Sequence, residues 1–396
     1  MRIAFLLQAH PEPGDPDTNL YSDLVDVFVK NGHEVVVITV VKEGQPTSFK
    51  KEGATEVLRV KTMKLFGVSP VAKGIANVLL PYQFIKAIKK YIPEKKIDLI
   101  ISPTPPITFI DVIQFLKRKS PGKCFLILRD IFPQNARDLG MITNPLLFGY
   151  FRRQEKKLYA TSDYIGCMSQ GNIDYVVKHN PEIDPKKISL LPNWQKVHSL
   201  SEKNGSIKAK YGLTDKYIAI FGGNIGEPQK IENIVTLAKE YRNNSDIVFL
   251  VVGAGARKKH LERLVAGNGL TNVLIKNQLP RSDYQELVYN SDVGLISLNE
   301  KFTIPNIPSK TLSYFNAKIP ILAAIDANTD YGKMLEESGA GLWSVTGDTA
   351  KYKHNFATLY NNPELRRQMG ENGYQYLTAH LTPDHSYKRI VEKLES

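Results

Sequence analysis

Apolar runs of strand length alternate with segments of helical periodicity along most of the chain. Residues 1–198 contain six such runs: RIAFLLQ, EVVVITVV, IDLIIS, CFLILRD, YIGCMS and ISLLPN. The stretch LYSDLVDVFVKNG is typical of the helices between them, and Gly32 ends its pattern. Strands that alternate with helices predict a parallel sheet covered by helices on both faces.

The alternation starts again after a polar stretch at residues 199–216, which is rich in Ser, Lys and Gly. Six further apolar runs follow: KYIAIFGG, IVFLVVGAG, NVLIKN, VGLISL, IPILAAI and GLWSV. We therefore expect an α/β protein with two doubly wound Rossmann-like domains, at 1–198 and 217–380, joined by a linker at 199–216. A C-terminal helix at 381–396 follows, with a return to the first domain as one option. Ligands of such sheets bind at the carboxyl ends of the strands, so we expect the two sheets to face each other across a ligand cleft.

The composition is that of a globular chain without a membrane span. Hydrophobic residues make up 42%, and no apolar run approaches the roughly 18 residues that a spanning helix needs. The start, MRIAFLLQAH, lacks a small-residue cleavage site, which favours a first strand and a cytoplasmic location over a secretion signal. Cys124 and Cys167 lie apart in apolar runs without metal-ligand spacing, so we expect reduced core thiols.

The net charge of +12 calls for a partner, and its distribution suggests one. The segment from Arg59 to Lys96 carries nine basic residues and one acidic residue, interleaved with Leu65, Phe66, Val78, Leu79, Leu80, Phe84 and Ile85. This mixture suits an anionic membrane surface on which the protein would lie peripherally; a solvated helix over an ordinary core is the alternative. We do not expect nucleic acid as a partner, because the chain has no zinc spacing, recognition-helix motif or RNP-like aromatic pattern.

A glycine cluster, FGGNIGEPQK, joins an apolar run to a helical pattern at the start of the second domain. Gly222, Gly223 and Gly226 allow the backbone to approach a ligand closely, and the following helix offers free N–H groups, so a phosphate fits here. The spacing matches neither G-x-G-x-x-G nor the P-loop, which disfavours a dinucleotide cofactor or an ATPase. A tight strand-to-helix turn without a ligand is the alternative.

A second cluster of candidate residues lies in the stretch NEKFTIPNIPSKTLSYFNAKIPILAAI. Ser309 is placed to cap a helix, and Lys310 stands in its first turn, where the helix dipole disfavours a cation. A bound anion would account for this position. An exposed lysine tolerated at small cost is the alternative.

These residues carry a resemblance to family 4 (group 1) glycosyltransferases of the GT-B fold. The motifs are GGNIGEPQKIENIVTLA, LVVGAGARKKHLERL, NVLIKNQLPRSDYQELVYNSDVGLISL and IPSKTLSYFNAKIPILAA. Within the family, the chain resembles the capsule and O-antigen branch that includes L-fucosamine transferases. The resemblance implies an N-terminal acceptor-binding domain and a C-terminal donor-binding domain. It also implies sugar transfer from a nucleotide-sugar, commonly a UDP-sugar, to a lipid-linked saccharide acceptor with retained configuration.

For the donor side, the resemblance places the diphosphate at the glycine loop. Gly223 and Asn224 stand where many relatives have Gly-Arg, and the loop lysine falls at Gln229 or Lys230. Lys310 matches the lysine of the Pro-Ser-Lys motif and is the stronger diphosphate candidate. The backbone at Asn277, Gln278 and Leu279 would border the base.

For the acceptor side, the resemblance assigns the segment RDIFPQNARD. Asp130 is the candidate for orienting the acceptor or the reacting sugar, with Arg129 beside it; capping of the next helix is the structural alternative. His10, at the end of the first strand, is a candidate acceptor contact, with a structural role beside a helix as the alternative. Gly14, in the loop after this strand, is a candidate for close approach to the donor. We do not assign a metal to the Asp15–Asp17 pair, since the family uses lysine and helix dipoles for the diphosphate, and we expect no cofactor.

Two carboxylates that relatives often carry near the sugar and ribose are absent. The aligned positions hold Pro305 and Ser313, and the glycine expected after the helix is replaced by Ala317 or Lys318. Glu300 and Asn306 lie nearby as substitutes. Two alternative functions stay open: a nucleotide-sugar epimerase of the same fold, and a non-catalytic partner protein, which the change at Ser313 favours.

Overall fold

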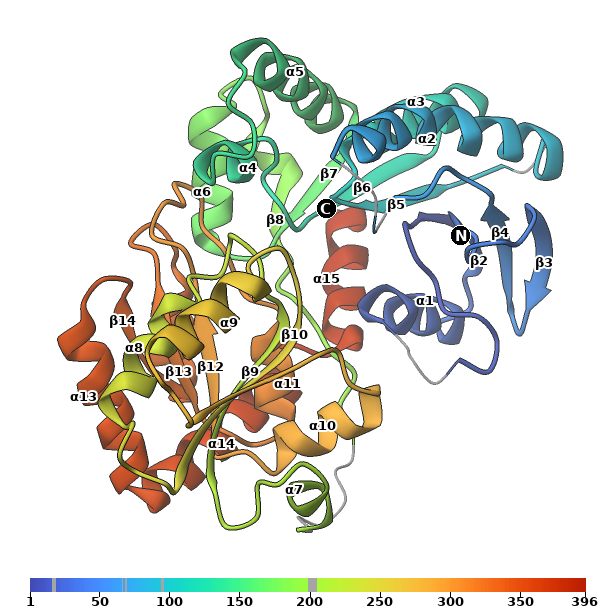
Figure 1. The fold of residues 1–396 in the computed structure, drawn as a ribbon. Helices are drawn as coiled ribbons and strands as arrows, with labels where there is room; N and C mark the ends of the chain where they lie inside the picture. Colours follow the sequence, from blue (N-terminus) through green and yellow to red (C-terminus); the bar gives the residue numbers. More distant parts are fainter. Residues whose placement is uncertain (16–18, 66, 68–69, 94–95, 199–204) are drawn as a thin grey trace. The chain divides into compact units, whose positions relative to one another are not determined.

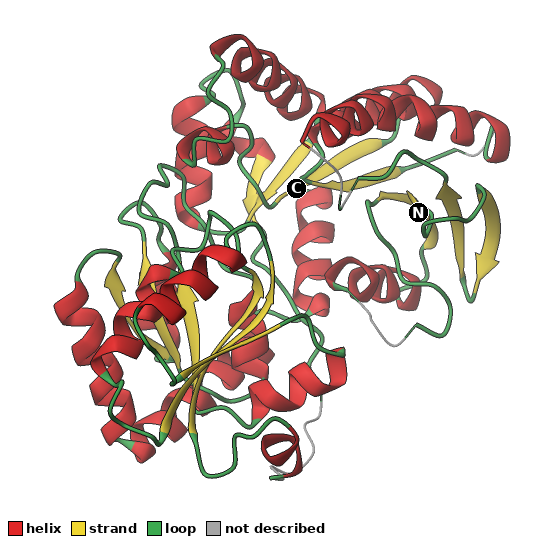
Figure 2. Ribbon diagram, in the orientation of Figure 1, coloured by secondary structure: helices red, strands yellow, loops and turns green. Residues whose placement is uncertain are grey.

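A computed structural model describes residues 1–15, 19–65, 67, 70–93, 96–198 and 205–396. The chain divides into two compact units. Unit 1 comprises Met1–Pro192 with Pro383–Ser396, and unit 2 comprises Asn193–Thr382. Each unit consists of one sheet with helices around it (Figures 1 and 2).

Unit 1 contains an eight-stranded sheet in the order β3-β4-β2-β1-β5-β6-β7-β8 over the described residues. Its strands are β1 (Arg2–Leu6), β2 (Glu34–Val40), β3 (Ser48–Glu52), β4 (Thr55–Val60), β5 (Leu99–Pro103), β6 (Lys123–Leu128), β7 (Tyr164–Cys167) and β8 (Ile188–Leu190). All neighbours pair in parallel except β3 and β4. The order reverses between β1 and β5, so the loops after these two strands form the expected ligand edge.

The helices of unit 1 cover both faces of this sheet (Figure 1). They are α1 (Leu20–Lys30), α2 (Pro70–Tyr91), α3 (Ile110–Lys119), α4 (Gln134–Asp138), α5 (Pro145–Thr161), α6 (Gln170–His179) and α15 (Pro383–Glu395), with 3₁₀ turns at Ile107–Phe109 and Pro185–Lys187. The C-terminal α15 packs on α1: the Tyr387 ring lies edge-on to Phe28, with centroids 4.8 Å apart, and its hydroxyl is 3.0 Å from Nε2 of His33. The last helix is thus part of the N-terminal unit.

Unit 2 contains a parallel six-stranded sheet in the order β11-β10-β9-β12-β13-β14. The strands are β9 (Tyr217–Asn224), β10 (Ile247–Ala254), β11 (Val273–Lys276), β12 (Val293–Ser297), β13 (Ile321–Ile325) and β14 (Gly341–Val345). Alternate residues of β9 enter two apolar cores: Ile218 and Ile220 face one, and Ala219 and Phe221 face the other. Burial on both faces explains why these strands read as continuous apolar runs.

Eight helices belong to the described part of unit 2. They are α7 (Ser206–Lys210), α8 (Glu232–Glu240), α9 (Lys258–Gly267), α10 (Arg281–Tyr289), α11 (Lys310–Asn316), α12 (Tyr331–Ser338), α13 (Thr349–Asn361) and α14 (Pro363–His380). The sheet order corresponds to the 3-2-1-4-5-6 arrangement of dinucleotide-type folds, which reverses between β9 and β12. A ligand is expected at the carboxyl ends of these two strands.

The predicted linker differs from the structure. Residues 199–204 lie outside the described residues, but 205–216 are folded into unit 2. Ile207 and Leu213 are buried in its core, and Asp283 binds both Lys210 and the Tyr211 hydroxyl, at 2.6 and 2.5 Å. The segment looked like a linker because only a few apolar residues anchor it.

The predicted basic and apolar segment between Arg59 and Lys96 is divided between core and surface. Arg59 is buried in β4, and Leu65, Leu80 and Phe84 are core residues, whereas Phe66 lies outside the described residues. Val78 and Leu79 are exposed. The solvated-helix interpretation is therefore correct for part of the segment, and an exposed apolar face remains on α2.

Candidate functional site

The glycine turn and Lys310 meet at the carboxyl edge of the unit 2 sheet, where the strand order reverses. Gly223, the penultimate residue of β9, has φ = +110°, and a Cβ placed on it would lie 3.8 Å from Cε of Lys310. Lys310 opens α11, which follows the long loop after β12. Two segments that are 87 positions apart in the sequence therefore lie next to each other.

The ammonium group of Lys310 lies over the face of Phe221, with Nζ 4.6 Å from the ring centroid. Within the described residues, no carboxylate forms an ion pair with it. The side chain is partly exposed, but protein atoms surround its ammonium group, and this burial lowers its pKa to about 8. A cation that is desolvated without a counter-ion gains most from a bound anion.

The three glycines of the turn have different structural reasons. A Cβ on Gly222 would lie 1.9 Å from the Tyr284 hydroxyl oxygen, and one on Gly226 would lie 2.6 Å from Nδ2 of Asn224. Packing thus explains Gly222 and the local turn explains Gly226, without a ligand. Gly223 is different, because its left-handed backbone requires glycine while the nearest neighbour is the flexible end of Lys310.

A second glycine turn, which was not predicted as part of the site, supports the first. Gly253 lies near the end of β10 and Gly255 directly follows it. A Cβ on Gly253 would lie 1.9 Å from the Gly223 carbonyl oxygen, and one on Gly255 would lie 2.2 Å from that of Ile225. The Ile225 N–H donates to the Ala254 carbonyl at 2.8 Å. The two turns therefore pack backbone against backbone. The signal in the sequence was the string GAGA on the neighbouring strand.

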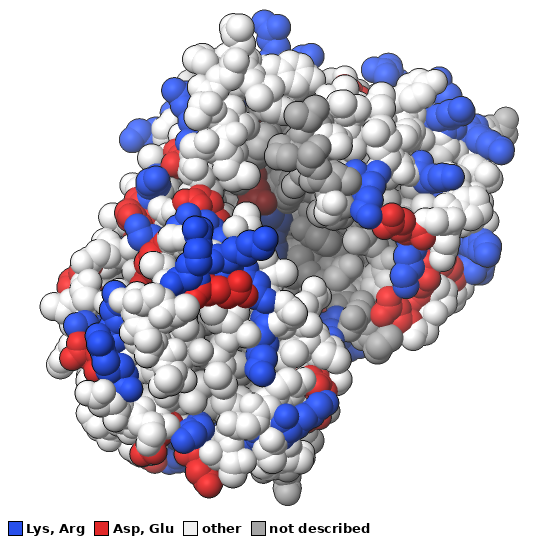
Figure 3. Space-filling model, in the orientation of Figure 1, with Lys and Arg blue, Asp and Glu red and all other residues white. Residues whose placement is uncertain are grey.

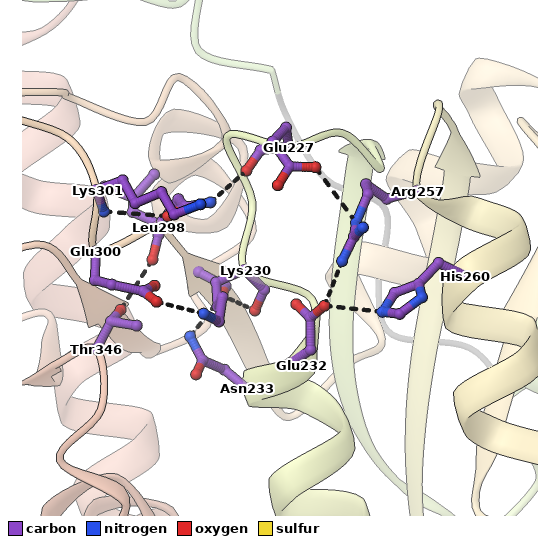
Figure 4. A network of polar contacts seen from close by, with 12 residues as sticks. Glu227, Lys230, Glu232, Asn233, Arg257, His260, Leu298, Glu300, Lys301 and Thr346 are labelled. Atoms are coloured by element: carbon purple, nitrogen blue, oxygen red, sulfur yellow. Dashed lines mark hydrogen bonds and ion pairs between the residues drawn. The ribbon is translucent and has the colours of Figure 1, made fainter. Parts of the chain in front are cut away.

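Lys230 is held in an ion pair instead of standing free beside the glycine turn. Its ammonium group binds the carboxylate of Glu300 (Figure 4). Its carbonyl accepts a 2.6 Å hydrogen bond from Ser297 at the end of β12. Glu300, considered as a substitute for a missing sugar or ribose carboxylate, is therefore engaged with Lys230. Of the two candidate lysines, Lys310 is the one without an acidic partner in the described residues.

A further charged cluster fixes the loop after the glycine turn. The guanidinium of Arg257 lies 2.6 Å from Glu232 and 3.5 Å from Glu227, and Nε2 of His260 lies 3.0 Å from Glu232 (Figure 4). The Arg257 N–H also donates to the Ile225 carbonyl at 3.0 Å. This network joins β10 and α9 to the loop between β9 and α8, so it holds the turn in shape.

The remaining donor candidates lie at the same edge with different surroundings. Asn277 and Gln278 are exposed after β11, and the side-chain oxygen of Asn277 accepts a hydrogen bond from Lys258. Leu279 packs on the core of unit 2. These positions agree with a loop that borders a ligand.

Helix α11 places Ser313 on the face of Lys310, three residues on. Ser309 does not cap the helix as predicted: it has helical backbone angles, and its side chain makes no capping hydrogen bond. The next residue, Tyr314, is buried and donates to the Ile220 carbonyl at 3.1 Å, which fixes α11 to β9. After the helix, Lys318 has φ = +53°, a left-handed backbone conformation that favours glycine. Of the two candidate positions, Lys318 is therefore the one that corresponds to the glycine expected from the resemblance.

In unit 1, Arg129 and Asp130 follow β6 at the carboxyl edge of the sheet. The Thr104 hydroxyl, after β5, accepts hydrogen bonds from both backbone N–H groups, at 3.0 and 3.2 Å. Burial raises the pKa of Asp130, and the charge of Arg129 opposes this shift. Asp130 does not cap α4, because the N-cap residue is Pro133 and no side chain makes the capping hydrogen bond. The structural alternative for Asp130 is thus wrong.

The loop after β1 carries the other two acceptor-side candidates. Arg59 donates to the carbonyls of His10 and Pro11 at 2.9 and 2.6 Å and pairs with Glu52 at 2.7 Å. Burial, with the charge of Arg59, lowers the pKa of His10 to about 4, so its imidazole is neutral near pH 7. Gly14 has φ = +83° in an open turn, where an added Cβ would have no described atom within 4 Å. Asp17 lies outside the described residues.

The chain is similar to known glycosyltransferases in both sequence and fold. The family model for glycosyl transferases group 1 matches residues 204–376. "Probable glycosyltransferase WbjE" of Pseudomonas aeruginosa is 22% identical over 275 residues, 68% of each chain. The solved structure of WaaG, a glycosyltransferase involved in lipopolysaccharide biosynthesis, covers 98% of each chain with a TM-score of 0.65 and 16% identity. Anabaena HepE in complex with UDP-glucose covers 100% of this chain and 99% of its own, with a TM-score of 0.71 and 13% identity.

The chain is therefore a glycosyltransferase with the two Rossmann-like domains of the GT-B fold. Residues 204–376, most of which belong to unit 2, are similar to the glycosyl transferases group 1 family. None of the helices in the described residues combines the length and apolar character needed to cross a membrane. Within the same residues, no three His, Cys, Asp or Glu side chains are grouped to hold a metal ion.

Proposed function

We propose that this glycosyltransferase moves a sugar from a UDP-sugar to a lipid-linked saccharide, with retained configuration, in the synthesis of a bacterial capsule or O-antigen. The observation that carries the proposal is Lys310, a desolvated cation beside the open backbone of Gly223. The similarity to HepE, solved with UDP-glucose, supports a uridine nucleotide as donor, and that to WaaG, which acts in lipopolysaccharide biosynthesis, supports a lipid-linked saccharide as acceptor. The exposed basic and apolar face of α2 agrees with peripheral attachment to the inner face of the cell membrane.

The mechanism follows from the charge that develops as the donor reacts. Cleavage of the bond between sugar and phosphate builds negative charge on the departing diphosphate. We assign its stabilisation to the ammonium group of Lys310 and to the glycine turn at Gly223 and Asn224. On the acceptor side, Asp130 orients the hydroxyl or the sugar. We assign front-face transfer, in which the departing phosphate helps to take the acceptor proton.

The lowered pKa of Lys310 makes UDP binding dependent on pH. The diphosphate interacts with the protonated lysine, and protonation is lost as the pH rises through about 8. We therefore expect the UDP affinity to fall as the pH rises above this value, by up to about tenfold per pH unit, until the contribution of the lysine charge is lost. Calorimetric titrations with UDP on both sides of pH 8 measure the effect. Lys310→Arg, whose guanidinium stays protonated, should give a flat profile; a flat wild-type profile contradicts the assignment.

A panel of nucleotide-sugars tests the function itself. We expect slow hydrolysis of one UDP-sugar and no hydrolysis of GDP- or ADP-sugars, because water replaces an absent acceptor in the site. An epimerase would convert the UDP-sugar into its isomer, and a non-catalytic partner protein would leave every donor unchanged. The expectation that no metal is needed is tested by EDTA in the same assay: turnover should persist, and its loss would show a metal requirement.

A further inference from the structure

Helix α2 has an exposed face that is apolar along its first half. Ile75, Val78, Leu79 and Tyr82 are 39–67% exposed, and their spacing of three and four residues puts them on one side of the helix. The opposite side is a normal core face, with Ala76, Leu80, Phe84 and Ile88 buried. Helix α2 is therefore apolar on both sides, and the described part of unit 1 covers only one of them.

Helix α5 also has exposed apolar side chains along its first half, and the sequence did not predict this surface. Leu146 is 84% exposed, and Leu147 and Tyr150 are nearly half exposed; Met141, just before the helix, is 69% exposed. Eleven large apolar side chains are exposed among the described residues, and eight of them lie on α2, on α5 or at Met141. Scattered exposed apolar residues need no explanation, but such a concentration marks a contact surface.

The topology brings the two apolar ends to the same edge. Helix α2 connects β4 to β5 and α5 precedes β7, and these strands are parallel, so both helices run opposite to the strands. Their first turns therefore lie at the carboxyl edge of the sheet, which also holds Asp130. Helix α3 packs between α2 and α5, so both lie on one face of unit 1 (Figure 1).

Basic residues complete each helix beyond its apolar half. Helix α2 has four lysines and no acidic residue, and Lys86, Lys89 and Lys90 are exposed in its second half. In α5, Arg153 and Lys157 are exposed, and the acidic Glu155 is buried against Arg152 at 2.6 Å. Figure 3 shows Lys and Arg side chains, with few acidic ones, over this end of unit 1.

We propose that the apolar stripes of α2 and α5, together with their basic ends, form one docking surface for an anionic lipid bilayer. The stripes, Ile75, Val78, Leu79 and Tyr82 with Met141, Leu146, Leu147 and Tyr150, enter the interface, and the lysines contact the headgroups. A second copy fits poorly, because face-to-face contact would bring the lysines of both copies together. The proposal deepens the membrane attachment proposed above and rests on it, since it places the bilayer beside the edge where Asp130 would receive a lipid-linked acceptor.

Vesicle sedimentation of the full chain tests the surface. We expect binding to phosphatidylglycerol-containing vesicles and weak binding to phosphatidylcholine vesicles. Leu146→Ser with Leu147→Ser should weaken binding about tenfold or more, as should Val78→Ser with Tyr82→Ser, because each pair removes two interfacial side chains. Reversal of Lys86, Lys89 and Lys90 to Glu should abolish binding, whereas the same reversal at Lys239, Lys259 and Lys333, exposed on unit 2, should leave it largely intact.

Several results would overturn the proposal. If the variant with Leu146→Ser and Leu147→Ser binds vesicles as well as the wild type does, α5 is not part of the surface. If both triple lysine variants lose binding equally, net charge alone explains the effect. Equal binding to neutral and anionic vesicles would contradict the role of anionic headgroups. If the wild type is a dimer in the absence of vesicles and the serine variants are not, the partner of this surface is a second copy of the chain. Thermal melting checks that each variant is folded. UDP binding, measured on the same proteins, should not change; its absence in the wild type would refute the donor site and not the docking surface.

Discussion

Lys310→Ala is expected to lower turnover about 10²–10³-fold while weakening the binding of the intact UDP-sugar donor much less. The ammonium group is close to Gly223 and, within the described residues, has no acidic partner, so its charge is available to a diphosphate. Its contact strengthens as negative charge develops on the leaving group, and a contact of that kind affects kcat more than binding. Turnover rates and calorimetry with the intact UDP-sugar on the same protein separate the two effects.

Lys230→Ala is the matched control, because it removes another lysine from the same edge of the sheet. Its ammonium group is already neutralised by Glu300, and partly exposed ion pairs contribute about 0–1 kcal/mol, so rate and affinity should change only a few-fold. If Lys310→Ala has the affinity and rate of the wild type, the diphosphate does not bind at this turn. If Lys230→Ala has the larger effect, the loop lysine and not Lys310 is the diphosphate ligand.

The strands that the sequence predicted correctly are those with an apolar run. All twelve predicted apolar runs contain strands, and most of these are central parallel strands that helices cover on both faces, so they need no polar face. The hairpin of β3 and β4 was missed. Its strand sequences, SFKKE and TEVLRV, contain charged residues. Two of these form ion pairs within the sheet, Glu52 with Arg59 and Glu56 with Arg2. Charged residues that pair across strands have no apolar pattern to reveal them.

The role of a site residue could be predicted where it follows from the residue type and its position in an element. It could not be predicted where it depends on a neighbour that is distant in the sequence. Lys310 was identified because a lysine in the first turn of a helix is unusual. The different states of Lys310 and Lys230 depend on Glu300, which follows β12 some 70 residues after Lys230. Likewise, Gly222 depends on Tyr284, and the loop of His10 depends on Arg59. Such pairs are set by the strand order, which a single sequence does not give.

Asp130→Asn is expected to lower transfer about 10²-fold or more while leaving the melting temperature close to that of the wild type. Within the described residues, the carboxylate caps no helix, and the charge that acts on it is that of Arg129. Its backbone is fixed independently, through the N–H contact with Thr104 at 3.2 Å. Asparagine keeps the shape and this backbone contact, so the variant removes mainly the charge that orients the acceptor. Initial rates with a saccharide acceptor, together with thermal unfolding, measure both outcomes.

The control for Asp130 removes an exposed carboxylate from a neighbouring element of the same unit. Asp111 is exposed in the first turn of α3, and Asp111→Asn should change transfer less than about twofold, since the charge it removes is solvated. UDP binding provides the second check, because unit 2 holds the diphosphate candidates Lys310 and Gly223: Asp130→Asn should leave it unchanged. A variant that unfolds at a much lower temperature but still transfers sugar would show that Asp130 supports the fold. Equal losses in donor hydrolysis and transfer would assign Asp130 to the reacting sugar, whereas a loss confined to transfer would assign it to the acceptor.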